Sequence, residues 1–207
     1  MNTTTYQRTL KMVQLALFTA IILLMAFTPI GYIRIPGLAL SITLLVVPVT
    51  VGAIILGPVS GAILGGVFGI TSFIQCFGMD PFGSTLLSIN PIGTFVVTML
   101  PRILMGWLSG IIFISIKKID RTKSVSYAVT SLAGPLLNTV LFMSTLILIF
   151  YRTEFIQGIA SGMGTNNVFA FVSVFVGING LVEAAICFIL GTAISKAVDV
   201  FAKKSGI

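Results

Sequence analysis

A single arginine, Arg102, lies well inside an apolar stretch of the chain, residues 95–116. The stretch is long enough to cross a bilayer as a helix, and a charged side chain at such a depth costs about 2.5–3.5 kcal/mol on insertion scales. Its planar guanidinium can bind a carboxylate or a phosphate through two parallel hydrogen bonds. The position therefore predicts recognition of an anionic ligand group. The alternative is a structural arginine that reaches the membrane interface or joins two helices.

Further polar side chains occur in apolar stretches later in the chain. Asn179 and Glu183 are one helical turn apart and share a face, as do Thr98 and Arg102. At 1.5 Å per residue, Arg102 lies about 13 Å below the outer end of its helix, and the Asn179–Glu183 pair about 15–21 Å below the outer end of its own. Asn138 falls near mid-membrane. We therefore expect these groups to converge in the outer half of a helical bundle.

Two structural alternatives remain open for these polar groups. Each could form a helix–helix hydrogen bond, worth about 0.6 kcal/mol on average in membranes. Glu183 could also be the ion-pair partner of Arg102, and a ligand anion could then compete for the same arginine. The predicted substrate-binding residues are Arg102, Asn138, Asn179, Glu183, Thr98 and Asn90.

The residue inventory argues against several kinds of chemistry. The chain has no histidine, and Cys76 and Cys187 lie in apolar stretches without a metal or redox spacing. Glu183 is the one acidic residue in a predicted span, so a pair of catalytic carboxylates is not available there. We expect no enzyme activity, no catalytic residue, no metal and no cofactor. The net charge of +7 comes from short basic clusters beside apolar stretches, which is not a nucleic-acid pattern.

Composition predicts the fold class. Of 207 residues, 57% are hydrophobic and 8% are charged, whereas a soluble domain has about 25% charged residues. We predict an all-α membrane protein that forms a single domain, residues 1–207. Its six transmembrane helices are expected at residues 10–27, 40–56, 59–77, 94–116, 125–150 and 168–194. Pro48 predicts that the second helix is tilted or broken.

The distribution of basic residues predicts the orientation. With six spans and the N-terminus inside, nine lysines and arginines lie in inner segments, and Arg34 and Arg152 lie in outer ones. This positive-inside bias places both termini in the cytoplasm. The outer segments would be a membrane-leaning loop at residues 28–37, a folded lid at residues 78–93, and a third loop at residues 152–167.

Four glycines recur every fourth residue around the third predicted span: Gly57, Gly61, Gly65 and Gly69. On a helix this spacing leaves one bare stripe, so that another backbone can approach closely. The stripe predicts close helix packing and carries no chemistry of its own.

These features together resemble a known family. Four segments show the resemblance: Ala16-Leu-Phe-Thr-Ala20, the run from Ile55 to Gly65, Pro101-Arg-Ile-Leu-Met-Gly106 and Asn179-Gly-Leu-Val-Glu183. In order and spacing they resemble the substrate-binding S components of energy-coupling factor (ECF) vitamin transporters, and the resemblance covers most of the chain.

The resemblance implies partners and a location. Ala16 and Ala20 would contact a transmembrane coupling subunit, and two cytoplasmic ATPases would drive import across a prokaryotic plasma membrane. The outer loops and the fourth to sixth helices would hold a vitamin-type small molecule.

Three kinds of alternative remain for the function. Arg102, nearby amides and few aromatic residues favour pantothenate as the substrate, with riboflavin, folate, cobalamin or another micronutrient as alternatives. A facilitator that acts without ATPases is a second possibility. A third, from a different class, is a membrane enzyme or assembly factor that acts on a lipid head group.

Overall fold

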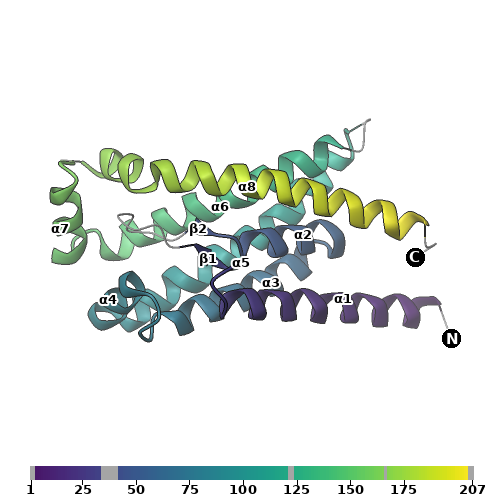
Figure 1. The fold of residues 1–207 in the computed structure, drawn as a ribbon, viewed down its shortest axis with the longest axis horizontal. Helices are drawn as coiled ribbons and strands as arrows, with labels where there is room; N and C mark the ends of the chain where they lie inside the picture. The colour runs from purple at the N-terminus through teal and green to yellow at the C-terminus, as the bar shows by residue number, and fades with distance from the viewer. Residues whose placement is uncertain (1–2, 34–41, 121–123, 166, 205–207) are drawn as a thin grey trace.

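The computed structural model describes residues 3–33, 42–120, 124–165 and 167–204, and shows a helical bundle with one small strand pair (Figure 1). The elements in chain order are α1 (Thr3–Ala26), β1 (Tyr32–Ile33), β2 (Ile42–Thr43), α2 (Val46–Leu56), α3 (Pro58–Gln75), α4 (Pro81–Ile89), α5 (Pro91–Lys117), α6 (Val125–Phe150), α7 (Glu154–Gly162) and α8 (Val168–Lys204). The helical class predicted from composition is confirmed.

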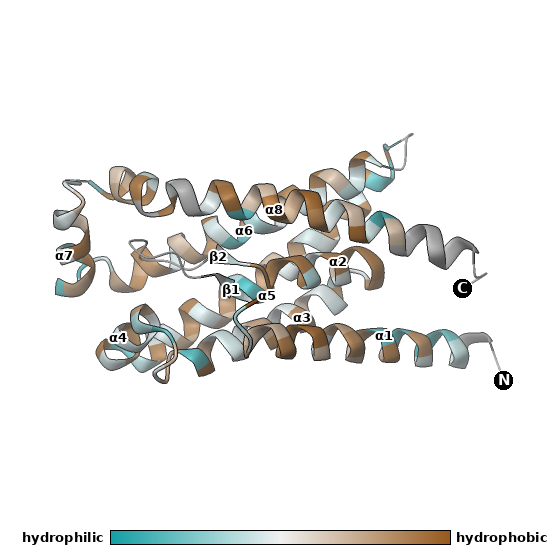
Figure 2. Ribbon diagram, in the orientation of Figure 1, coloured by the Kyte–Doolittle hydropathy of each residue, from teal (hydrophilic) through white to brown (hydrophobic). Residues whose placement is uncertain are grey.

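Five helices of the described chain are long and apolar enough to cross a membrane: α1, α3, α5, α6 and the Gly180–Ala197 part of α8. Figure 2 shows hydrophobic residues along the middle of α1 and hydrophilic ones towards its start. The start of α1 and the end of α8 lie at the same end of the bundle, and α4 and α7 lie at the other end (Figure 1).

The second predicted span, residues 40–56, forms a shorter helix than expected. It contains the 11-residue α2, which is about 16 Å long at 1.5 Å per residue and so shorter than a hydrocarbon core of about 30 Å. Ten of its eleven residues are buried, so α2 is the centre of the bundle rather than a lipid-facing helix. Pro48 lies in its first turn, where backbone N–H groups have no helical partner, and therefore does not interrupt it.

The packing of α3 against α5 depends on small residues. A Cβ atom added to Gly61 would meet the carbonyl oxygen of Gly106, and one added to Gly65 would meet that of Arg102. Gly69 lies close to Met99. Gly57 has a different role, since it has open space around it and a φ of +92° at the turn between α2 and α3. Three of the four predicted stripe positions therefore hold α5 against α3.

The helix that carries Arg102 is continuous. It runs from Pro91 to Lys117 without a break at Pro101, although a proline inside a helix removes one backbone hydrogen-bond donor. Asn90 Oδ1 accepts a hydrogen bond from the Gly93 amide at 2.9 Å, which caps the first turn and fixes where the helix begins.

The segments that contain α4 and α7, at the end of the bundle opposite the start of α1, are folded (Figure 1). The predicted lid contains α4, whose N-cap Asp80 accepts a hydrogen bond from the Gly83 amide at 2.8 Å. The segment 152–167, expected as a loop, contains the nine-residue α7. That expectation was wrong because Ile156 and Ala160, one turn apart, give this short helix a buried face. The last helix also continues past residue 194, to Lys204.

The contact between α3 and α5 predicts a strong difference between two adjacent glycines. Gly65→Ala places a methyl group against the backbone of Arg102, and overpacking of this kind costs about 1–3 kcal/mol. Gly66→Ala is the matched control, because its Cβ would lie 3.8 Å from Ile103 Cγ1, an ordinary contact. Thermal unfolding in detergent should show a lower Tm for Gly65→Ala and an unchanged or higher Tm for Gly66→Ala. Equal Tm values would contradict this packing of α3 on α5.

Candidate ligand-binding site

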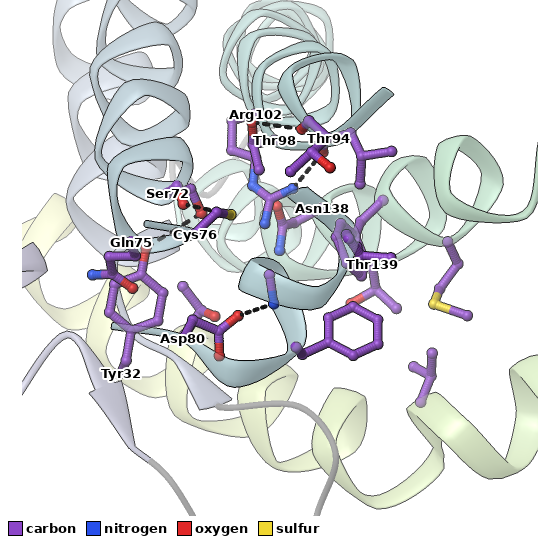
Figure 3. A pocket seen from close by; sticks show the side chains of 18 of the residues that line it. Tyr32, Ser72, Gln75, Cys76, Asp80, Thr94, Thr98, Arg102, Asn138 and Thr139 are labelled. Atoms are coloured by element: carbon purple, nitrogen blue, oxygen red, sulfur yellow. Dashed lines mark hydrogen bonds between the residues drawn. The ribbon is translucent and has the colours of Figure 1, made fainter. Parts of the chain in front are cut away.

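A cavity of about 110 Å³ lies where the strand pair, α4 and four long helices meet (Figure 3). It is lined by residues of seven elements and the turn after α3: Tyr32, Thr43, Ser72, Gln75, Cys76, Asp80, Phe82, Gly83, Leu86, Thr94, Val97, Thr98, Arg102, Asn138, Thr139, Phe142, Met143, Val176, Gly180 and Glu183. Polar groups and apolar side chains share its wall, which is typical of small-molecule sites.

Arg102 is held rigidly in this cavity. Its side chain is 8% exposed, and Nη1 donates a hydrogen bond to the carbonyl oxygen of Val97 at 2.8 Å. The guanidinium carbon lies 4.8 Å from the ring centroid of Phe142 and 5.4 Å from that of Phe68. Cation–π contacts with two rings stabilise the charge by about 0.5–2 kcal/mol each. Among the described residues, Arg102 Nε has no hydrogen-bond partner, so the guanidinium can still donate a hydrogen bond to a ligand.

Glu183 and Asn138 complete a buried polar group around the same cavity. Glu183 is 6% exposed, and its Oε2 accepts a hydrogen bond from the Thr43 amide at 3.3 Å, which joins α8 to β2. Its Oε1 and the Oδ1 of Asn138, a residue that is 7% exposed, have no partner within the described part of the chain. Glu183 and Arg102 interact electrostatically. Arg102 donates to the Val97 carbonyl, whereas Glu183 accepts from the Thr43 amide and also interacts with the side chain of Asn138.

The opposite wall comes from the strand pair and α3. Tyr32 pairs with Thr43 in the antiparallel register, and its hydroxyl lies 3.4 Å from Ser72 Oγ. The phenol group of Tyr32 can both donate and accept hydrogen bonds. Gln75 donates from Nε2 to the carbonyl oxygen of Ala26 at 2.7 Å, which ties the end of α1 to this wall.

The cavity is more aromatic than the sequence analysis expected. Tyr32, Phe82 and Phe142 line it, and Phe68 contacts the guanidinium from behind. The sequence analysis expected few aromatic residues inside the spans near Arg102, and of these three lining rings Phe142 alone lies in a predicted span, while Tyr32 and Phe82 come from the outer segments. Phe142 is four residues after Asn138, and so on the same face of α6.

The predicted substrate-binding residues fall into three groups. Arg102, Thr98, Asn138 and Glu183 all line the cavity. Asn90 caps α5 instead and is not part of the lining. The side chain of Asn179 lies outside the described residues.

The sequence analysis missed several polar lining residues. Thr43, Ser72 and Gln75 come from the second and third predicted spans, which it did not assign to the pocket. Tyr32 and Asp80 come from outer segments that it did assign, but it did not name these residues. The available signal was the spacing of Ser72 and Gln75, which are three residues apart and so share a face at the end of an otherwise apolar helix.

Comparison with known proteins gives consistent matches. Residues 10–195 match the family described as "ECF transporter, substrate-specific component". The chain is 28% identical over 200 residues to the pantothenate transporter PanT of Leuconostoc mesenteroides subsp. mesenteroides, covering 92% of each chain. It is 30% identical over 193 residues to the pantothenic acid transporter PanT of Lactococcus lactis subsp. cremoris, covering 88% of this chain and 90% of that one.

The family match spans nearly the whole chain, including every element that lines the cavity. These relatives are transporters, which agrees with the expectation that the chain is not an enzyme. The chain belongs to the family of substrate-specific components of ECF transporters.

Proposed function

We propose that this chain binds pantothenate from outside the cell and delivers it to an ECF import complex. The observation that carries this proposal is a set of three buried polar atoms without partners in the described structure: Arg102 Nε, Glu183 Oε1 and Asn138 Oδ1. An unpaired buried polar group costs about 1–3 kcal/mol, and more if it is charged. A ligand that carries an anion and hydrogen-bonding groups would satisfy all three.

The chemistry of pantothenate matches this set of groups. Arg102 would bind its carboxylate, because a guanidinium held by Val97 and Phe142 keeps one fixed orientation. Asn138 and Glu183 would bind its amide and hydroxyl groups. The apolar side of the cavity, with Leu86 and Met143, would contact its dimethyl group. The names of the two relatives support the same ligand.

The proposed topology has six crossings, with both termini in the cytoplasm of a cell-membrane protein. In this arrangement α2 and the strand pair together form the second crossing. The positive-inside pattern supports it, and so does the position of the start of α1 and the end of α8 at one end of the bundle (Figure 1). The cavity would then open to the outside, beneath α4.

The proposed coupling face is on α1. Ala16 and Ala20 are exposed, and their neighbours Met12, Val13 and Leu17 are 60–70% exposed. Small side chains on an exposed membrane helix let another helix approach closely. We assign this face to a transmembrane coupling subunit that works with two cytoplasmic ATPases.

Changes at Arg102 test the ligand assignment. Arg102→Gln should weaken pantothenate binding to the purified protein by about 2–5 kcal/mol, because a buried charge-assisted contact is lost. Arg102→Lys should restore part of the affinity, because the lysine ammonium keeps the positive charge but cannot form the two parallel hydrogen bonds of a guanidinium. Isothermal titration measures the affinity, and thermal unfolding checks the fold.

The double variant Arg102→Gln/Glu183→Gln separates binding from structure. If Arg102 served only to neutralise Glu183, the single change would lower Tm and the double change would restore both Tm and binding. We expect binding to stay lost in the double variant, and its recovery would overturn the ligand assignment.

Bulky substitutions on α1 test the coupling face. Ala16→Trp and Ala20→Trp should abolish pantothenate uptake by cells that contain the whole transporter, while the purified variants still bind pantothenate. Ala193→Trp, at an exposed position of α8, is the matched control and should leave uptake near the wild-type rate. Parallel loss of binding and uptake in both α1 variants would argue against this face.

Hydrogen exchange tests whether α4 acts as a lid. Pantothenate should slow exchange across Pro81–Ile89, because Phe82 and Leu86 line the cavity and α4 would open less often over bound ligand. Exchange around Lys117–Asp120, at the other end of α5, should not respond. Identical responses in the two segments would rule out closure by α4.

A further inference from the structure

The charges around the cavity are unequal. Arg102 is the one basic side chain among the described lining residues, whereas two lining residues, Asp80 and Glu183, are acidic. A ligand with one carboxylate can be neutralised by Arg102. A second anionic group on the same ligand would find no further cation within the described wall.

The two acidic residues do not contribute equally. Asp80 caps α4 and accepts a hydrogen bond from the Gly83 amide, so its charge is compensated by a helix N-terminus. In Glu183 the Thr43 amide holds Oε2, while Oε1 has no partner among the described residues. Because one oxygen is tied to the strand pair, the carboxylate cannot easily turn away from the cavity. At 6% exposure, solvent screens it weakly.

We propose that Glu183 makes the site selective for a singly charged acid and excludes the same acid once it carries a phosphate. The identity of the acid rests on the proposed function. With the carboxylate of pantothenate on Arg102, phosphorylation of its primary hydroxyl would place two further negative charges at the other end of the ligand. These charges would meet Glu183 without a compensating cation, and like charges in a desolvated site strongly disfavour binding.

Two ligands and three proteins test this selectivity by isothermal titration. The ligands are pantothenate and its ester with phosphate on the primary hydroxyl, and the proteins are the wild type, Glu183→Gln and Glu154→Gln. The wild type should prefer pantothenate by about 100-fold or more. Glu183→Gln keeps an acceptor for the Thr43 amide but removes the charge, so the preference should fall at least about tenfold. Glu154→Gln removes the same charge at an exposed position of α7 outside the lining, so it should leave the ratio within about twofold.

The outcomes separate this inference from the proposed function. If the wild type does not bind pantothenate, the proposed function is wrong. If it binds pantothenate but binds the phosphate ester equally well, the selectivity is wrong, whether or not a variant folds. An unchanged preference in a folded Glu183→Gln protein would also overturn the role of Glu183. Glu183→Met provides a second uncharged variant if the glutamine variant unfolds.

Discussion

The burial of one guanidinium inside a membrane bundle is the constraint on which the rest of the structure depends. Arg102 is 8% exposed, and it is stabilised by the Val97 carbonyl and by the rings of Phe142 and Phe68. The backbone of Arg102 contacts Gly65, so the glycine stripe of α3 fixes the position of the charge. The packing of α3 against α5 and the position of the Arg102 guanidinium therefore depend on the same backbone contact.

The same constraint explains the irregular elements inside the bundle. Exposed backbone is costly in hydrocarbon and is tolerated against protein or a polar cavity. The Thr43 amide meets this requirement by donating to Glu183 in the wall of the cavity, and the Tyr32 hydroxyl lies 3.4 Å from Ser72 Oγ. The polar site thus stabilises the strand pair that covers it, while α2 remains short and almost entirely buried.

The sequence predicted the features that depend on strong, local physical rules. An apolar composition, a buried arginine and glycines at four-residue spacing give the helical class, the central site residue and the α3–α5 contact. It did not predict α7, whose nine residues make only about two and a half helical turns, nor Asn90 as a cap instead of a ligand group. Tyr32 and Gln75 could not be placed at the site, because their positions depend on how distant elements meet.

The most direct test of the central claim changes the ligand rather than the protein. Titration of the purified wild type with pantothenate and with its neutral carboxamide compares two ligands that differ in the charge proposed to meet Arg102. A buried charge-assisted contact of this kind predicts that the carboxamide binds about 30-fold or more weaker than pantothenate. Equal affinity for the two ligands would show that Arg102 does not bind the carboxylate and would contradict the account.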